Sequence, residues 1–289
     1  MMERKLINAG PSERGWHRLE SFNRCPQLYA YEKLAGLEWT SMSPPLVKGI
    51  LVHVGLAHYY RQVQATQLGE NPDEWYDPNE AMGLVAADLG SMGAEWLPLA
   101  TRAVAGYKAF YSQERHKILD VEKELRADVW IPQLAHTVLY TQRADLITEK
   151  DGKVWIWDHK TGFRTGQQMT TRYVLSGQFQ GLRWFGGKLY GDKFGGLILN
   201  QVGLGNKEIV YKRPSIPPAP NLLKQFPQVI ADAETGMATL EREGRDPWEY
   251  PKAASEQVCI TPYGRCPGFA LCQWGKAGLD EAGAKEKAK

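Results

Sequence analysis

A hairpin signal at Asp151-Gly152 constrains the fold of this chain more than any other feature of its sequence. An Asp-Gly pair between two strand-like runs is typical of a two-residue β-turn that joins antiparallel strands. The runs cover residues 137–148 and 154–160 and are rich in β-branched and aromatic residues. If Asp151 and Gly152 form the turn, Lys150 faces Lys153 and the pairing continues outward from there.

The same register brings two carboxylates together, because it places Asp145 opposite Asp158. Directly opposed side chains in an antiparallel pair have Cβ atoms about 4.5–5.5 Å apart, so the two charges repel each other. A divalent cation between them turns this cost into a binding site. Strand alternation puts Lys160 on the face of Asp158 and turns His159 away. The hairpin therefore predicts an Mg²⁺ or Mn²⁺ site at which a lysine orients or activates a water.

A plainer interpretation of the hairpin is a surface turn whose aspartates and lysine are only solvated. An Asp-x-Lys triplet is common in proteins, and by itself it supports this plainer interpretation. The second aspartate in register, Asp145, weighs against it.

The remaining pattern indicates an α/β chain with a helical N-terminal portion and a C-terminal appendage. Ser21 is the expected N-cap of the first helix, and Pro44-Pro45 is expected to break the chain. Strands are expected over 121–131, 137–148, 154–160, 194–203 and 208–213. Helices are expected over 49–60, 78–117 with a break near Pro98, 175–189 and 221–243. The polar tail 282–289 is expected to fray.

Composition points to an ordinary globular protein, with 43% apolar and 24% charged residues in 289. The formal net charge of +2 neither requires nor excludes a polyanionic partner. The first residues hold no apolar run typical of a signal peptide, and no stretch of about 18 apolar residues occurs. We therefore expect no membrane span and a cytoplasmic location, where disulfides are rare.

The four cysteines suggest a metal centre, because three of them lie close together near the C-terminus. They are Cys259, Cys266 and Cys272, and the fourth is the distant Cys25. Four thiolates suit either tetrahedral Zn²⁺ or a [4Fe–4S] cluster. The paired Cys-x-x-Cys knuckles usual in structural zinc sites are absent from the sequence. Reduced structural thiols are the other possibility.

These motifs together resemble the PD-(D/E)xK nuclease superfamily, and within it the RecB-like and Cas4-like branch. The resemblance spans nearly the whole chain. It rests on Gly49-x-x-x-His53, Asp145, Trp157-Asp158-His159-Lys160-Thr161-Gly162, Gln178 and the cysteine set. It implies a restriction-endonuclease-like mixed sheet flanked by helices, in a single nuclease domain over 1–289. Its expected parts are a helical part (1–117), a catalytic α/β core (118–215), a helix with the cluster-bearing C-terminus (216–275) and a tail (276–289).

The resemblance also implies roles for individual residues. His53, Asp145 and Asp158 would ligate the catalytic metal together with the carbonyl of His159. Lys160 would be the catalytic lysine, and Gln178 would position that lysine or the DNA backbone.

Three assignments within the resemblance leave alternatives open. The family often places an aromatic residue four positions after its glutamine, but Leu182 stands there, so Gln180 with Trp184 is an alternative register. Glu122 resembles an acidic residue found one strand before the first aspartate, and Glu124 competes for that place. His58 has no motif support and is expected to be structural.

The cysteine pattern resembles the iron–sulfur staple of Cas4 and AddB-type nucleases. By this resemblance Cys25, Cys259, Cys266 and Cys272 hold a [4Fe–4S] cluster that joins the two ends of the chain, with Zn²⁺ as the alternative. The first interval of the triplet is longer than is usual in the family, which leaves the type of cluster open.

The resulting functional expectation is a Mg²⁺- or Mn²⁺-dependent exonuclease that hydrolyses phosphodiester bonds of single-stranded DNA or DNA ends. The sequence carries no G-x-x-x-x-G-K-[S/T] motif, so no ATP-driven motor is expected. Such an enzyme would suit phage recombination, replication or CRISPR adaptation proteins as partners. The alternatives are a catalytically inactive DNA-binding module and a zinc-stapled interaction protein with the same fold.

Overall fold

The computed structural model describes residues 4–40, 42–205, 208–253, 255–261 and 264–286, and it divides the chain into two compact units. The first unit contains residues 1–13, 43–126 and 141–226. The second contains residues 14–42, 127–140 and 227–289. None of the described helices is long and apolar enough to cross a membrane.

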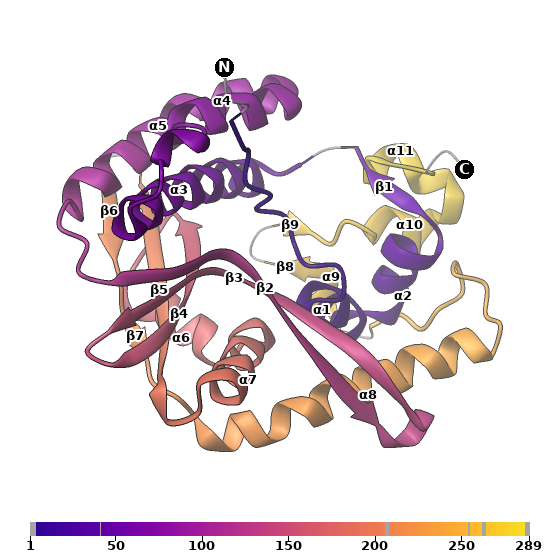
Figure 1. Ribbon diagram of the computed structural model, residues 1–289. Coiled ribbons are helices and arrows are strands. Elements are labelled where there is room, and N and C mark those ends of the chain that lie inside the picture. Colours follow the sequence, from indigo (N-terminus) through magenta and orange to yellow (C-terminus); the bar gives the residue numbers. More distant parts are fainter. Residues whose placement is uncertain (1–3, 41, 206–207, 254, 262–263, 287–289) are drawn as a thin grey trace. The chain divides into compact units, whose positions relative to one another are not determined.

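A mixed sheet forms the centre of the first unit, as Figure 1 shows. Its strand order is β2-β3-β4-β5-β6, and β7 pairs with β5. The strands β4 and β5 are parallel, whereas the β3–β4, β5–β6 and β5–β7 pairs are antiparallel. The bounds are β2 (Lys117–Ile131), β3 (His136–Lys150), β4 (Lys153–Gly162), β5 (Phe194–Leu204), β6 (Ile209–Lys212) and β7 (Ser215–Ile216).

The β3–β4 hairpin confirms the turn and the register predicted from Asp151-Gly152. Both turn residues have positive φ, 53° and 72°, as a type I′ turn requires. The pairs run from Lys150 with Lys153 to Leu146 with Trp157. Asp145 and Asp158 lie one position beyond this last pair.

Helices cover both faces of the sheet (Figure 1). The long α3 (Pro44–Leu68) packs on β4 from one side, with α4 (Pro78–Asp88) and α5 (Gly90–Phe110) packed on α3. On the other side α7 (Gly177–Tyr190) packs on β4 and β5, and α6 (Gln167–Val174) precedes it. This crossover of two helices is what makes β4 and β5 parallel.

Two predictions about prolines in this unit are wrong. Pro44 and Pro45 do not break the chain but begin α3, because the first turn of a helix needs no backbone N–H bonds from its residues. Pro98 lies inside α5, where it removes one hydrogen bond without ending the helix. The break falls instead between α4 and α5 at Gly90, whose φ of 62° is left-handed.

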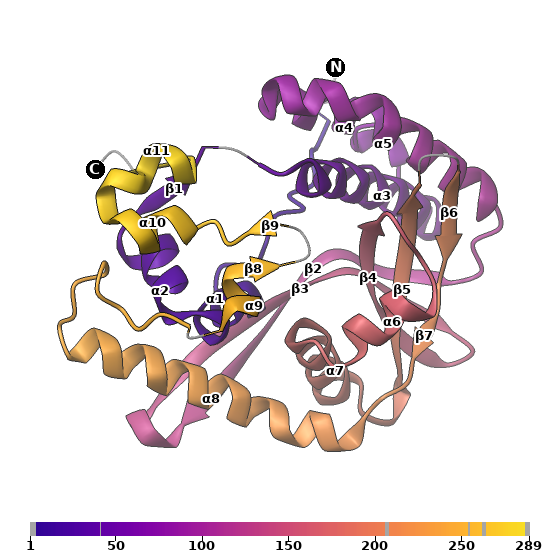
Figure 2. The ribbon, with the colours of Figure 1, turned by 180° about the vertical axis from the view of Figure 1, so that it is seen from behind.

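The second unit is built from short elements, which Figure 2 shows gathered around the N-terminal helices. Its apolar cluster centres on Tyr31, Leu37 and Leu271. The elements are α1 (Trp16–Arg24), α2 (Pro26–Tyr29), a π-helical turn (Ala30–Leu34), β1 (Leu37–Trp39), α9 (Glu256–Cys259), β8 (Ile260–Thr261), β9 (Gly264–Arg265), α10 (Phe269–Trp274), α11 (Leu279–Ala282) and β10 (Ala284–Glu286). The helix α8 (Pro220–Arg242) contributes its residues from Pro227 onward.

Two further sequence predictions need correction here. Ser21 is not an N-cap but lies inside α1, which begins at Trp16. The chain instead becomes extended at Cys25, with φ −164°, and Pro26 then starts α2. The predicted frayed tail is partly ordered, because Ala284–Glu286 pair with Leu37–Trp39, while residues 287–289 lie outside the described part.

Candidate active site

Asp158 and Lys160 project from β4 to the same side, as strand alternation predicts. The ammonium of Lys160 lies 2.6 Å from Oδ2 of Asp158, and the Asp158 side chain is only 2% exposed. The other oxygen, Oδ1, accepts a hydrogen bond from Nε2 of Gln178 at 2.7 Å. Gln178 is the second residue of α7, so helix and strand together hold the carboxylate from both sides.

Asp145 comes from β3 and points to the same region. Its Oδ2 accepts a hydrogen bond of 2.5 Å from the backbone N–H of His159. This side-chain bond extends the hairpin contact one position past the last ladder pair. It ties the carboxylate of Asp145 directly to the backbone between Asp158 and Lys160.

The two aspartates differ in how readily they ionise. Burial raises the pKa of Asp158 to about 6; Lys160 opposes this rise and the nearby Asp145 carboxylate adds to it. Burial also disfavours ionisation of Asp145, but His53, His159 and Lys160 outweigh it and lower the pKa of that carboxyl. Burial acts to lower the pKa of Lys160, yet Asp158 and Asp145 raise it, so the lysine stays charged. At Asp158 the effect of burial therefore outweighs the attraction of the Lys160 ammonium.

His53 reaches this region from α3, as the Gly49-x-x-x-His53 spacing suggests. Its Nδ1 lies 3.7 Å from Oδ2 of Asp145. A Cβ added at Gly49 would meet Oγ1 of Thr161 at 3.3 Å, so the helix and β4 touch at the glycine. One turn later, this close approach brings the histidine to the carboxylates.

His159 turns its ring away from Lys160, toward α3, as predicted from the alternation. The ring stacks on Tyr60 at 5.9 Å between centroids and meets His53 edge-on at 5.8 Å. The residue is 1% exposed, and burial lowers the pKa of its imidazole to about 3. His159 is therefore neutral at physiological pH, and only its backbone faces the carboxylates.

The alternatives left open at Gln178 and Glu122 are resolved by geometry. Gln180 donates to the carbonyl of Leu175, whereas Gln178 bonds Asp158, so Gln178 is the glutamine at the site. Glu124 pairs with Arg126 at 2.7 Å.

Glu122 is half-buried like Glu124, but it lies close enough to Asp145 and Asp158 for their charges to act on it. Burial, and then the charges of Asp145 and Asp158, raise its pKa well above the usual value, although Arg143 opposes the rise. Its Oε1 has no hydrogen-bond partner. Its φ of 51° is left-handed, which is rare for a residue inside a strand. Such strain persists where the surrounding structure demands it, often at functional sites.

His58 is structural, as expected. Its Nε2 accepts a hydrogen bond from the backbone N–H of Ile7 at 3.1 Å, and its Nδ1 contacts the carbonyl of Tyr76 at 2.9 Å. Both ring nitrogens are thus engaged in joining the N-terminal segment to the segment before α4.

The donor chemistry of this region fits Mg²⁺ or Mn²⁺, because carboxylate oxygens dominate it. The charge of Asp145 raises the pKa of both Glu122 and Asp158, and Oε1 of Glu122 has no hydrogen-bond partner. As they stand, however, no three His, Cys, Asp or Glu side chains among the described residues form a group able to hold a metal ion. The ammonium of Lys160 contacts Oδ2 of Asp158, so it would lie next to a cation bound by this carboxylate.

The four cysteines form a second candidate site, within the second unit. All four line one cavity of about 230 Å³, together with Leu28 and Tyr31. The cavity lies between α1–α2 and the C-terminal elements α9 and α10, which are adjacent in Figures 1 and 2. Cys25 therefore lies in the same cavity as the three C-terminal cysteines, although no three of these side chains, in the described part of the chain, form a group able to hold a metal ion.

The thiols of this cavity are close enough to influence one another. Burial raises the pKa of Cys266 and Cys272, and the neighbouring thiols raise it further, although local hydrogen bonds oppose the rise. The backbone N–H of Ala253 donates to Sγ of Cys25 at 3.4 Å. All four cysteines are free of disulfides.

Sequence reasoning missed two polar residues that stand behind the site, Asn200 and Arg213. Asn200 on β5 is fully buried and bonds the ring of His159. Arg213 follows β6 and contacts Tyr60 and Tyr107. The signal for Asn200 was available, since it interrupts the apolar run Gly195–Val202 of a buried strand.

Comparison with known proteins agrees with this arrangement. The chain matches the PD-(D/E)XK nuclease superfamily over residues 16–273. No curated protein matches it. A solved structure from Eubacterium rectale, provisionally described as an exonuclease, shares 9% identity with a TM-score of 0.50, covering 91% of this chain and 93% of its own.

A second solved structure, titled SSO0001, shares 12% identity over 63% of this chain and 73% of that one, and its TM-score of 0.33 is too low to bear on the fold. The first likeness supports the fold alone, whereas the family match covers most of the sequence. The chain therefore belongs to the PD-(D/E)XK nuclease superfamily.

Proposed function

We propose that this protein is a Mg²⁺- or Mn²⁺-dependent deoxyribonuclease that hydrolyses phosphodiester bonds at its Asp145–Asp158–Lys160 site. The observation that carries the proposal is the ammonium of Lys160, 2.6 Å from the buried carboxylate of Asp158, with Asp145 nearby and Gln178 bonded to Asp158. A purely structural sheet has no reason to bury such a set, because each charge costs desolvation. Family membership supplies the reaction class.

Each residue of the proposed site has a role that follows from its chemistry. Asp145 and Asp158 are the proposed metal ligands, together with His53 and the carbonyl of His159. A bound divalent cation supplies a Lewis acid for a phosphate oxygen and lowers the pKa of a water. Lys160 orients the attacking water or stabilises charge that develops on the phosphate. Gln178 bonds Oδ1 of Asp158, so that Oδ2 stays turned toward Lys160.

Single-stranded DNA or a DNA end is the proposed substrate. Phe163 is 64% exposed and Arg164 is exposed beside it, just past the end of β4 and close in sequence to Lys160. An exposed aromatic ring next to a cation suits base stacking with a phosphate contact, as proteins use on single strands. The solved structure described as an exonuclease is compatible with action at ends.

End-labelled single- and double-stranded DNA, incubated with Mg²⁺, Mn²⁺ or EDTA, tests this function. We expect metal-dependent shortening of the single strand, abolished by EDTA and by Asp158→Asn. The matched control is Asp192→Asn, an exposed aspartate on a helical turn away from the site. A folded parent protein that leaves every substrate intact with both metals would refute the nuclease proposal. If Asp158→Asn cleaved DNA as fast as the parent, the active site would lie elsewhere in the chain.

We propose further that Cys25, Cys259, Cys266 and Cys272 hold a [4Fe–4S] cluster. Support comes from the cavity that all four line and from the absence of disulfides. A [4Fe–4S] cluster is commonly held by four cysteine thiolates, which is the number that this cavity supplies.

Iron, acid-labile sulfide and zinc contents of anaerobically purified protein distinguish the two metal centres. A cluster predicts a brown protein with about four iron atoms and four sulfides per chain. One zinc per chain in a colourless protein would establish the alternative. Protein free of both metals, with four titratable thiols, would leave the cysteines structural.

A further inference from the structure

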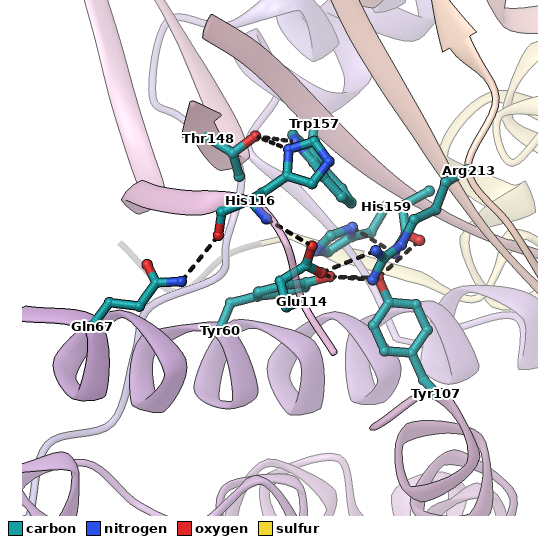
Figure 3. Close-up of polar contacts among 10 residues, drawn as sticks. Tyr60, Gln67, Tyr107, Glu114, His116, Thr148, Trp157, His159 and Arg213 are labelled. Carbon is teal, nitrogen blue, oxygen red and sulfur yellow. Dashed lines mark hydrogen bonds and ion pairs between the residues drawn. The ribbon is translucent and has the colours of Figure 1, made fainter. Parts of the chain in front are cut away.

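A buried polar network extends from Arg213 to the ring of His159, behind the proposed active site. It consists of Glu114, Arg213, Tyr60, Tyr107, Asn200 and His159, and we call it the Arg213 network. Figure 3 shows the guanidinium of Arg213 among Glu114, Tyr60 and Tyr107, with His159 beside them. Its members come from α3, α5, β4, β5 and the segments after α5 and β6. Tyr60, Tyr107 and Asn200 are completely buried.

The guanidinium of Arg213 determines which atoms of the network donate hydrogen bonds and which accept them. Arg213 donates to Oε2 of Glu114 at 2.9 Å, to the hydroxyl of Tyr60 at 2.7 Å and to that of Tyr107 at 2.8 Å. A guanidinium has no acceptor, so both hydroxyl oxygens must accept from it. Each tyrosine then has one proton left to give.

The acceptor of each hydroxyl proton follows from the distances. The Tyr60 and Tyr107 hydroxyls are 2.7 Å apart, and Tyr107 donates to Oδ1 of Asn200 at 2.9 Å. Tyr60 then donates to Tyr107, because its only other acceptor, Glu114, is 3.4 Å away. If Tyr107 donated to Tyr60 instead, the bond between the two hydroxyls would remain, but the 2.9 Å bond from Tyr107 to Asn200 would be exchanged for the 3.4 Å bond from Tyr60 to Glu114.

The orientation of the Asn200 amide follows from this assignment of donors and acceptors. Its oxygen accepts from Tyr107, so its NH₂ group faces Nδ1 of His159, at 2.9 Å. Nδ1 must accept this bond, and the single proton of a neutral imidazole is then on Nε2. We propose that the Arg213 network holds His159 as the neutral Nε2–H tautomer and thereby positions its backbone, whose N–H bonds Asp145 and whose carbonyl is a proposed metal ligand.

The proposal gives the network a role in metal binding, and this part rests on the proposed nuclease function. The backbone N–H of His159 holds Asp145 at 2.5 Å, so a rotation of residue 159 displaces a proposed ligand. The ring is clamped by Asn200 on its edge and by Tyr60 on its face, at 5.9 Å. Partners that orient metal ligands typically change metal affinity by about 10–100-fold when they are lost. Asn200 and Tyr107 are therefore positioning residues that never touch the substrate.

Long-range ¹H–¹⁵N correlation NMR on ¹⁵N-histidine protein reads the tautomer without metal or DNA. The chain has six histidines, and His159 is recognised by the loss of its signals in His159→Gln. We expect the Nε2–H pattern in the parent. In Asn200→Asp a carboxyl oxygen replaces the NH₂ group and faces Nδ1, so the proton should move to Nδ1. An Nδ1–H pattern in the parent, or no change in Asn200→Asp, would overturn the proposal.

Mn²⁺ affinity, followed by the EPR signal of free Mn²⁺, tests the positioning role without requiring cleavage. Tyr107→Phe removes one hydroxyl and keeps the ring, so the fold is retained where an Arg213 variant could unfold. We expect about tenfold weaker Mn²⁺ binding, with kcat at saturating Mn²⁺ close to that of the parent.

The matched control for this measurement is Tyr29→Phe, which makes the same change as Tyr107→Phe. It removes the hydroxyl of a buried tyrosine whose hydrogen bond of 3.1 Å goes to Glu241 and not to a member of the Arg213 network. Mn²⁺ binding by Tyr29→Phe should equal that of the parent, and an equal loss in both variants would mean that only general packing is at work. A parent that binds no Mn²⁺ and cleaves no DNA would refute the nuclease function and the metal role together, while the NMR measurement would still decide the tautomer.

Discussion

The side chain of Gln178 donates a hydrogen bond of 2.7 Å to Oδ1 of Asp158, across the interface between helix α7 and strand β4. The backbone carbonyl of Gln178 is itself held, because it accepts from Nε2 of Gln142 at 2.6 Å. The start of α7 is thus attached to β3, and Asp158 is attached to the start of α7. Gln178 thus links β3 and β4 to α7, in the crossover between β4 and β5.

Replacing this glutamine should slow catalysis more than it weakens binding. In Gln178→Ala the carboxylate of Asp158 loses one partner and gains rotational freedom, so we expect kcat to fall about tenfold with little change in KM. Steady-state cleavage of a labelled single strand measures both. Gln180→Ala, which removes only a bond to the carbonyl of Leu175, should retain parental kcat. Equal losses in the two variants would assign the effect to α7 as a whole.

Lys160 should matter for turnover rather than for substrate affinity. Lys160→Ala should lower kcat by about 10²–10³, the usual cost of removing one group that stabilises developing charge. DNA affinity, measured by fluorescence anisotropy in Ca²⁺, should change little. Lys153→Ala removes an exposed lysine of the same strand, which bonds the carbonyl of Asp192, and should be neutral. Parental turnover in folded Lys160→Ala would show that another group provides the positive charge.

The contact at Gly49 should limit the size of the residue tolerated there. Gly49→Val places branched carbons against Thr161, and we expect about 1–3 kcal/mol lower stability from overpacking, together with weaker metal binding through His53. Gly83→Ala is the matched control, because nothing lies within 4 Å of its added Cβ. It should stabilise α4 by about 0.5–1 kcal/mol through helix propensity. Urea unfolding measures both changes, and a Gly49→Val protein as stable as the parent would contradict the close packing.

Cys25 provides the sharpest test of the proposed metal centre, because it is the one cysteine of the cavity that lies in the N-terminal segment. Cys25→Ser should bleach the protein, lower its iron content and reduce its thermal stability, since a metal centre stabilises the fold that forms it. Ser21→Ala, a change one helical turn earlier in α1 at a buried hydroxyl bonded to Glu32, should keep the colour. Full iron content and colour in anaerobic Cys25→Ser would exclude a four-cysteine centre.

The sequence alone determined the features of this protein that depend on nearby residues. Asp151-Gly152 imposed the turn because both positions need positive φ, and the alternation of the strands then set the register as far as Leu146 and Trp157. The Asp-x-Lys triplet and the Gly49-x-x-x-His53 spacing located the candidate ligands, and the cysteine set indicated which residues meet in the cavity.

Only the tertiary structure decided the features that depend on distant segments. The choice of Gln178 over Gln180, and of Glu122 over Glu124, depends on which side chain faces Asp158 or Asp145, and a sequence spacing does not contain that information. The Arg213 network joins residues 60, 107, 114, 159, 200 and 213, which share no local pattern. Their positions follow from the packing of two helices on three strands, because buried donors and acceptors must find partners wherever the fold places them.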